Sequence, residues 1–162
     1  MDTSFRRRIY RNLGELVADF RSVMAQRKAI RPLMRGEVID SAFRERLMLA
    51  VTAVNECRYC SYAHAREALA KGISPEELEA LQNGMFEGSP PDEVPALLYA
   101  QHWAESEGHP EAALHAQMVA RYGEQTMAAI DLALQMIRAG NLSGNTFDYL
   151  LYRLSFGRLG GG

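Results

Sequence analysis

The chain is poor in several features that mark common classes of protein. It has only two cysteines and one tryptophan in 162 residues, and its formal net charge is −2. Without an overall excess of positive charge, nucleic acid is not an expected partner. The longest apolar run, Leu47 to Val54, contains Thr52 and is far too short to cross a bilayer. The first residues are basic but have no apolar stretch behind them, so we expect no signal peptide. A cytoplasmic protein with no membrane partner is predicted.

Several motifs of catalysis and cofactor binding are also missing. There is no glycine-rich phosphate loop and no Gly-x-Ser-x-Gly sequence, so a nucleotide site and a hydrolase have no support. His102, His109 and His115 are not at helical ligand spacing, and Pro110 interrupts them. We interpret these histidines as surface or interface residues, and we expect no metal, haem or flavin.

What is present is the pattern of an all-α protein. No segment shows the period-two alternation of a strand. We expect one helical domain over residues 1–162, with its core motif at about 40–85. Arg31-Pro32 and Gly140-Asn141 are interpreted as helix breaks. Apolar periodicity, caps and breakers predict helices from Ser4 to Gln26, from 41 to Asn55, from the first cysteine to Gly72, from Ser74 to near Gly84, and over about 93–107, 111–122, 125–139 and 146–156.

The predicted helix at 41–55 is apolar on nearly all sides and should be buried. Glu45 lies on this helix, and Met48 and Leu49 flank it one turn later on the same face. A carboxylate in such a place needs a partner or a raised pKa. One interpretation is a surface acid favoured by the helix dipole. The other is a general base in a semi-apolar pocket, with a raised pKa.

The only two cysteines fall in the stretch Cys57-Arg-Tyr-Cys60-Ser-Tyr-Ala-His64. At about 100° per residue of helix, both thiols and the imidazole occupy one face within two turns. In a reducing cytosol, a lone Cys-x-x-Cys is typical of a catalytic or metal site rather than a structural disulfide. The stretch is therefore the best candidate site in the chain.

Three interpretations of this stretch compete. The cysteines and the histidine could simply be buried and satisfied. They could form a zinc site completed by Glu45 or Glu56, although the second cysteine pair usual in structural sites is missing. The favoured interpretation is a redox dithiol at the start of a helix, where the helix N-terminus and Arg58 would stabilise a thiolate and His64 would transfer protons.

The spacing of these residues resembles a known family. Glu45 stands twelve residues before Cys57, Cys60 follows at x-x spacing, and His64 comes four residues later. This pattern, with Gly72-Ile-Ser74 after it, is similar to the carboxymuconolactone decarboxylase superfamily in its alkylhydroperoxidase D-like branch. The resemblance covers about residues 40–85.

The resemblance implies an all-helical homo-oligomer, often a trimer or hexamer, that reduces hydroperoxides with electrons from a thiol or dithiol reductant. Cys60 would be the peroxidatic nucleophile and Cys57 the resolving thiol. Glu45 and His64 would form the proton relay. Some peroxidase members carry histidine where this chain has Tyr59, which can donate a hydrogen bond but is no base at pH 7.

Other functions remain as alternatives. Disulfide oxidoreductase activity would need the same thiols. A decarboxylase is less favoured, because true decarboxylases of the superfamily generally lack the thiol pair. The alternative from another class is a non-enzymatic helical oligomer that senses redox state or binds metal. In that case the first 35 residues, which hold nine of the eighteen Lys and Arg, could form the surface that binds a partner.

Overall fold

The computed structural model describes residues 5–160, and its regular structure in that range is entirely helical, as predicted. Helix α3 begins after Asp40, which accepts N–H bonds from Ala42 and Phe43, and α5 begins after Ser74, which accepts one from Glu77. The eight helices in this range are Leu13–Ala25 (α1), Arg27–Met34 (α2), Ser41–Asn55 (α3), Arg58–Ala70 (α4), Pro75–Gln82 (α5), Val94–Glu105 (α6), Ala112–Tyr122 (α7) and Glu124–Leu154 (α8).

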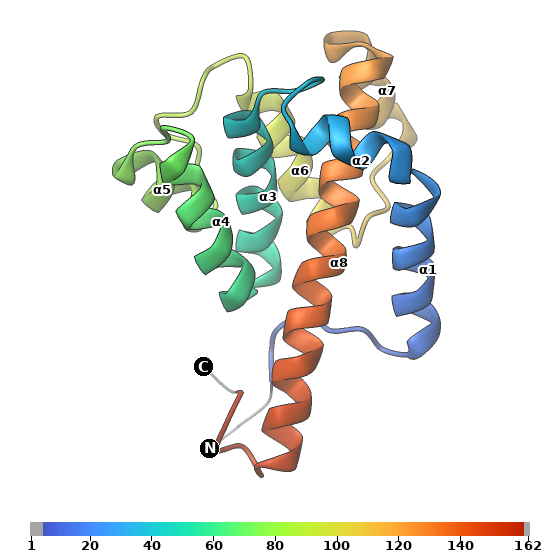
Figure 1. The fold of residues 1–162 in the computed structure, drawn as a ribbon, viewed down its shortest axis with the longest axis vertical. Helices are drawn as coiled ribbons and strands as arrows, with labels where there is room; N and C mark the ends of the chain where they lie inside the picture. Colours follow the sequence, from blue (N-terminus) through green and yellow to red (C-terminus); the bar gives the residue numbers. More distant parts are fainter. Residues whose placement is uncertain (1–4, 161–162) are drawn as a thin grey trace.

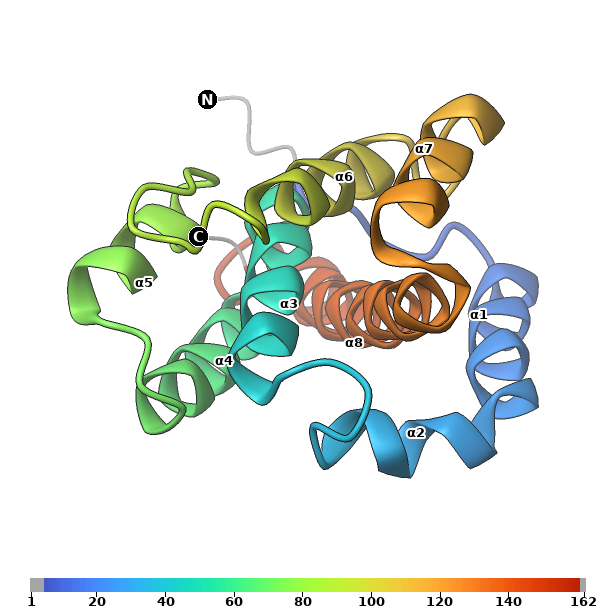
Figure 2. The same ribbon diagram turned by 90° about the horizontal axis from the view of Figure 1, so that it is seen from above.

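Helix α8 is the axis of the fold, and the other helices surround its N-terminal two thirds (Figures 1 and 2). Helix α3 packs against α4, α5, α6 and α8. Eleven of its fifteen residues are buried, which confirms the prediction for this segment. Helix α1 contacts α8 from the side opposite α4 (Figure 2). Within residues 5–160, no helix has both the length and the apolar character needed to cross a membrane.

The prediction of a first helix from Ser4 was wrong. Ser4 lies outside the described residues, but residues 5–11 are not helical, and α1 begins only after Asn12. The Asn12 side chain accepts the N–H of Glu15 and so caps the helix. The segment before it runs along α8, which supplies side-chain partners for its backbone: Thr146 accepts the N–H of Tyr10, and Asn145 donates to the carbonyl of Arg8.

Neither predicted helix break is present. Pro32 lies inside α2, near its end, and the Lys28 carbonyl that it leaves unbonded belongs to an exposed residue that water can reach. Helix α2 instead ends at Met34, and the chain turns at Gly36, whose φ of 74° lies in the left-handed region that favours glycine.

Gly140 and Asn141 lie in the middle of α8, which continues through them for 31 residues. One turn further along, at Gly144, a small residue is required because α8 passes close to the start of α4. A Cβ at Gly144 would lie 2.9 Å from the Sγ atom of Cys57, and one at Gly140 would lie 3.9 Å from that of Cys60. Gly144 therefore allows the two helices to meet, whereas a Cβ at Gly140 would make only an ordinary contact.

Candidate functional site

The two cysteines lie together where α3 ends and α4 begins. Glu56 reverses the chain with a φ of 55°, Cys57 is the N-cap of α4, and Cys60 is in its first turn. Both are free thiols, and their Sγ atoms are 2.8 Å apart. The Cys60 N–H also points to the Cys57 sulfur, at 3.4 Å. Cys57 is fully buried, whereas Cys60 is partly exposed.

The two thiols have opposite acidities. The sulfur–sulfur hydrogen bond lowers the pKa of Cys57 to about 6, against the effect of burial, and backbone N–H groups of the first turn of α4 act in the same direction. The same sulfur–sulfur hydrogen bond, together with burial, raises the pKa of Cys60. The pair therefore titrates as one unit. When the pair carries one negative charge, the two sulfurs share one proton.

Glu45 and His64 meet beside the thiols. The Oε2 atom of Glu45 is 2.7 Å from the Nδ1 atom of His64, and the Glu45 side chain is only 2% exposed. This burial excludes the surface-acid interpretation. Burial alone would raise the pKa of Glu45, but hydrogen bonds from His64 and Arg44 outweigh it, and the pKa is lowered. The expected raised pKa was therefore wrong.

The ionised Glu45 fixes the role of His64. A carboxylate can only accept, so Nδ1 of His64 carries the hydrogen of this bond, and in the neutral ring Nε2 is the nitrogen free to take a proton. His64 follows Cys60 by one helical turn on α4. The arrangement is that of an oriented base one helical turn from the Cys60 thiol.

Arg44 is the residue of the site that sequence reasoning missed most clearly. Its Nη2 and Nε atoms lie 2.8 and 3.1 Å from Oε1 of Glu45. Its Nη1 atom donates to the carbonyls of Leu33 and Met34 at the end of α2. Adjacent residues on a helix rarely face each other, so the pattern gave no sign of this pair. The available signal was the need of any buried carboxylate for a cation.

Asn141 of α8 is a second missed residue. It is fully buried, its Nδ2 atom donates to Oγ1 of Thr52 at 3.1 Å, and its Oδ1 atom accepts from Asn55 at 3.2 Å. The pKa of Cys60 is raised by the bond to Cys57 and by burial, and a hydrogen bond from Asn141 opposes both. Asn141 is thus placed to stabilise negative charge on Cys60.

Tyr59 faces away from the thiol chemistry, toward a buried acid. Its hydroxyl donates to Oδ1 of Asp148 at 2.7 Å. Arg58 donates to the same oxygen at 2.7 Å, and Arg7 donates to Oδ2 at 2.7 Å. Arg58, proposed from sequence as a neighbour of the thiolate, is therefore engaged by Asp148. This cluster joins the segment before α1, the start of α4 and the C-terminal half of α8.

A cavity of about 290 Å³ opens beside the buried thiol. Among residues 5–160, no group of three or more His, Cys, Asp or Glu side chains is placed to hold a metal ion. The cavity lies between α3, α4 and α5, and it is lined by Leu49, Thr52, Ala53, Glu56, Cys57, Arg58, Ser61 and Gln82.

Comparison with known proteins gives one match. The family model described as "Carboxymuconolactone decarboxylase family" matches residues 20–106, which is more than half of the chain. The matched range contains Glu45, Cys57, Cys60 and His64. No curated protein and no solved structure matches the chain.

Proposed function

The chain belongs to the carboxymuconolactone decarboxylase family, and we propose that within it the protein is a thiol-dependent peroxidase or disulfide oxidoreductase of the alkylhydroperoxidase D-like branch. One observation carries the proposal: a close dithiol and a buried carboxylate–imidazole pair occupy the same helix start. The sulfurs are 2.8 Å apart, and the Glu45–His64 contact is 2.7 Å. A decarboxylase would have no use for two thiols in contact.

The first step is attack by Cys60, because it is the partly exposed thiol. His64 takes the Cys60 proton on Nε2, while Glu45 stabilises the imidazolium through Nδ1. The Cys60 thiolate attacks one oxygen of the hydroperoxide, and the O–O bond breaks. The alkoxide that leaves receives the proton from His64 and departs as an alcohol. Cys60 is now a sulfenic acid, oxidised by two electrons.

The second step is resolution by Cys57. Backbone N–H groups of the first turn of α4 lower the pKa of Cys57, which favours loss of its proton as it attacks the sulfur of the sulfenic acid. The S–S bond forms, and the hydroxide that leaves takes up the proton released by Cys57 and departs as water. The sum is a dithiol and a hydroperoxide giving a disulfide, an alcohol and water. An external thiol or dithiol then reduces the disulfide and completes the cycle.

Intact mass spectrometry of the protein treated with one equivalent of hydroperoxide tests this proposal. The wild type should lose two hydrogens per chain, which shows an internal disulfide. Cys57→Ser should stop at the Cys60 sulfenic acid, which dimedone traps, and Cys60→Ser should not react at low dose.

The same experiment separates an enzyme from a redox sensor. An enzyme consumes many equivalents of hydroperoxide when dithiothreitol is supplied, whereas a sensor reacts once and slowly. Intermolecular dimers or overoxidised sulfur in place of the internal disulfide would contradict the proposed chemistry.

A further inference from the structure

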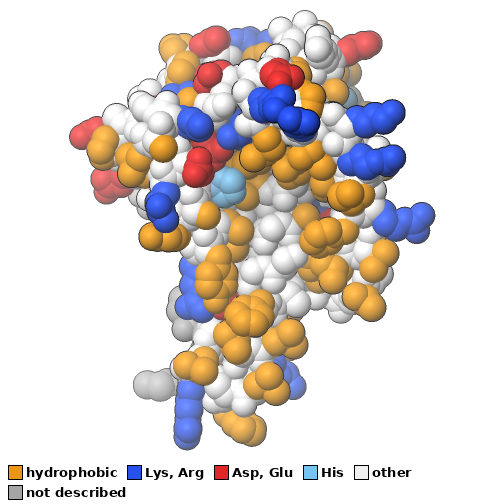
Figure 3. All heavy atoms as spheres, viewed as in Figure 1, with side chains coloured by type: hydrophobic (Ala, Val, Ile, Leu, Met, Phe, Trp, Pro, Cys, Tyr) orange, Lys and Arg blue, Asp and Glu red, His pale blue; other side chains and the backbone are white. Residues whose placement is uncertain are grey.

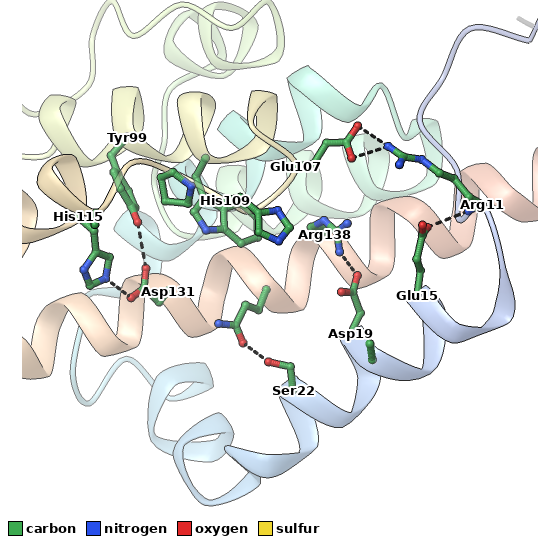
Figure 4. A pocket seen from close by; sticks show the side chains of 16 residues that line it. Arg11, Glu15, Asp19, Ser22, Tyr99, Glu107, His109, His115, Asp131 and Arg138 are labelled. Carbon is green, nitrogen blue, oxygen red and sulfur yellow. Dashed lines mark hydrogen bonds and ion pairs between the residues drawn. The ribbon is translucent and has the colours of Figure 1, made fainter.

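A second and larger cavity lies far from the thiols. It measures about 850 Å³ and opens between α1, the α6–α7 connection and α8 (Figure 4). We call it the α1–α8 pocket. Asp131 of α8 lies in its wall, ten residues before Asn141 on the same helix, so the two sites are about 15 Å apart along the axis. The size is in the range of small-molecule sites in proteins.

Aromatic side chains from α6 form part of the lining. Trp103 is 6% exposed and Tyr99 2% exposed, and they are one helical turn apart. Gly108, with a φ of 85°, lets the α6–α7 connection pass close over the indole, since a Cβ there would lie 3.2 Å from the ring. The connection therefore packs against Trp103 and holds its ring in place as an aromatic wall of the pocket.

The pocket carries an excess of negative charge. Its lining has four carboxylates but only two guanidinium groups. Arg11 pairs with Glu107 through two bonds of 2.6 and 2.8 Å, and Arg138 pairs with Asp19. The two remaining carboxylates, Glu15 and Asp131, are left without an arginine or lysine among the lining residues.

Asp131 is the better placed of these two acids. It accepts from Nε2 of His115 at 2.8 Å and from the Tyr99 hydroxyl at 3.5 Å (Figure 4). These partners fix the carboxylate next to the aromatic wall, because Tyr99 lies one turn from Trp103 on α6. Neither partner is an arginine or a lysine, so no permanent positive charge is paired with Asp131.

We propose that the α1–α8 pocket binds an organic ammonium ion with an aromatic body. The ammonium group would bond to Asp131, and the body would lie against Trp103 and the α6–α7 connection. A carboxylate and an aromatic face both attract a cation, and both effects are larger where water is excluded. This site is independent of the thiol chemistry and adds a second ligand class to the protein.

Fluorescence gives a direct test, because Trp103 is the only tryptophan in the chain. The probes are benzylammonium, benzyl alcohol and benzoate, which share one ring and differ in charge, titrated at pH 8 into the full-length protein. Benzylammonium should change the Trp103 emission saturably, and benzoate should need at least about tenfold more ligand. Equal responses to the three probes, or no saturable response to benzylammonium, would overturn the proposal without any mutation.

Substitutions then locate the ammonium group. Asp131→Asn keeps the shape, removes the charge, and should weaken benzylammonium binding about tenfold. Glu124→Gln makes the same change of charge at an exposed position in the first turn of α8 and should leave binding unchanged. Equal effects of the two substitutions would contradict the role of Asp131. Cys57→Ser should bind as the wild type does, so this test and that of the peroxidase chemistry can fail separately.

Discussion

Helices α3 and α1 are of similar length but differ in how many of their side chains are buried. Helix α3 buries eleven of fifteen residues, and three of these are the charged residues Arg44, Glu45 and Arg46. Helix α1 buries none of its thirteen. It instead exposes four large apolar residues at helical spacing, which we call the α1 stripe: Leu13, Val17, Phe20 and Met24.

The two helices are also held in place by opposite kinds of contact. Every charge buried on α3 has an ionic partner, and apolar packing surrounds these pairs. On α1, polar side chains face α8: Asp19 pairs with Arg138, and Ser22 bonds to Gln135. The apolar side points outward, on a face where apolar side chains gather (Figure 3). Helix α3 thus buries its apolar surface within one chain, whereas the apolar face of α1 is left exposed and needs a partner to cover it.

The largest expected effect comes from breaking the relay on α3. Glu45→Gln preserves the shape but leaves His64 without a negative partner. Proton transfer of this kind is worth about 10²–10⁴-fold, and we expect peroxide-driven thiol oxidation to slow by at least about tenfold. His64→Ala should act likewise, and the double variant should be less than additive because the two residues act as one unit. Stopped-flow oxidation of the reduced protein from pH 5 to 9 is the measurement.

A matched control exists at another buried arginine of α3. Glu77→Gln on α5 also removes a carboxylate from a buried arginine, Arg46, which has no role in the proposed thiol chemistry. It should lower stability and leave the oxidation rate unchanged. The lowered pKa of Glu45 means that its stabilising charge is complete above the unfolded value of about 4.3 and is lost only as pH falls through the folded value. Glu45 therefore stays ionised from pH 5 to 9, and wild-type rates in both relay variants would refute the relay.

A smaller effect is expected from substituting Asn141, which lies on the α8 side of the site. In a Cys57→Ser background, Asn141→Leu removes the hydrogen bond to Cys60 and should raise the pKa of the Cys60 thiol by about one unit. Thiolate absorbance at 240 nm against pH measures it. Asn145→Leu is the control, since Asn145 is equally buried on α8 but bonds to the carbonyls of Asn55 and Arg8. A shift of equal size in both variants would mean that general loosening, and not the bond to sulfur, sets the acidity.

Local signals were sufficient for much of α3 to α5. Caps at Asp40 and Ser74 act within one turn, so the sequence predicted where those helices begin. The Sγ atoms of Cys57 and Cys60 lie 2.8 Å apart, because residues three apart at the start of a helix are neighbours. The contact of Glu45 with His64 crosses from α3 to α4, and only the spacing shared with a family pointed to it.

What failed depended on packing between distant segments. Gly140 and Asn141 have poor helix propensity, but buried hydrogen bonds of Asn141 with Thr52 and Asn55 stabilise the helix at this point. The pKa of Glu45 was predicted in the wrong direction because hydrogen bonds from His64 and Arg44 together outweigh the effect of burial. The α1–α8 pocket joins residues more than a hundred positions apart, and no local pattern reports such a juxtaposition.

The last prediction concerns the α1 stripe, whose exposed fractions run from 45% at Val17 to 72% at Leu13. We propose that a second copy of the chain covers it, because closed symmetric assembly is the usual way to bury such a face. Light scattering of the wild type should then give a multiple of 18.1 kDa, as a trimer or hexamer. Phe20→Glu places a charge in the centre of the stripe and should reduce the mass to that of a smaller species, a three- to sixfold change if the monomer is reached.

The control for assembly is an equally exposed apolar residue elsewhere. Met85 is 48% exposed, close to the 49% of Phe20, and lies after α5. Met85→Glu adds the same charge and should leave the mass unchanged. Since Phe20 belongs to a helix with no buried residue, its substitution should cost the monomer little stability. Dissociation of Phe20→Glu with an intact helical spectrum would therefore report the interface itself, and a monomeric wild type at micromolar concentration would show that α1 keeps its apolar face in water.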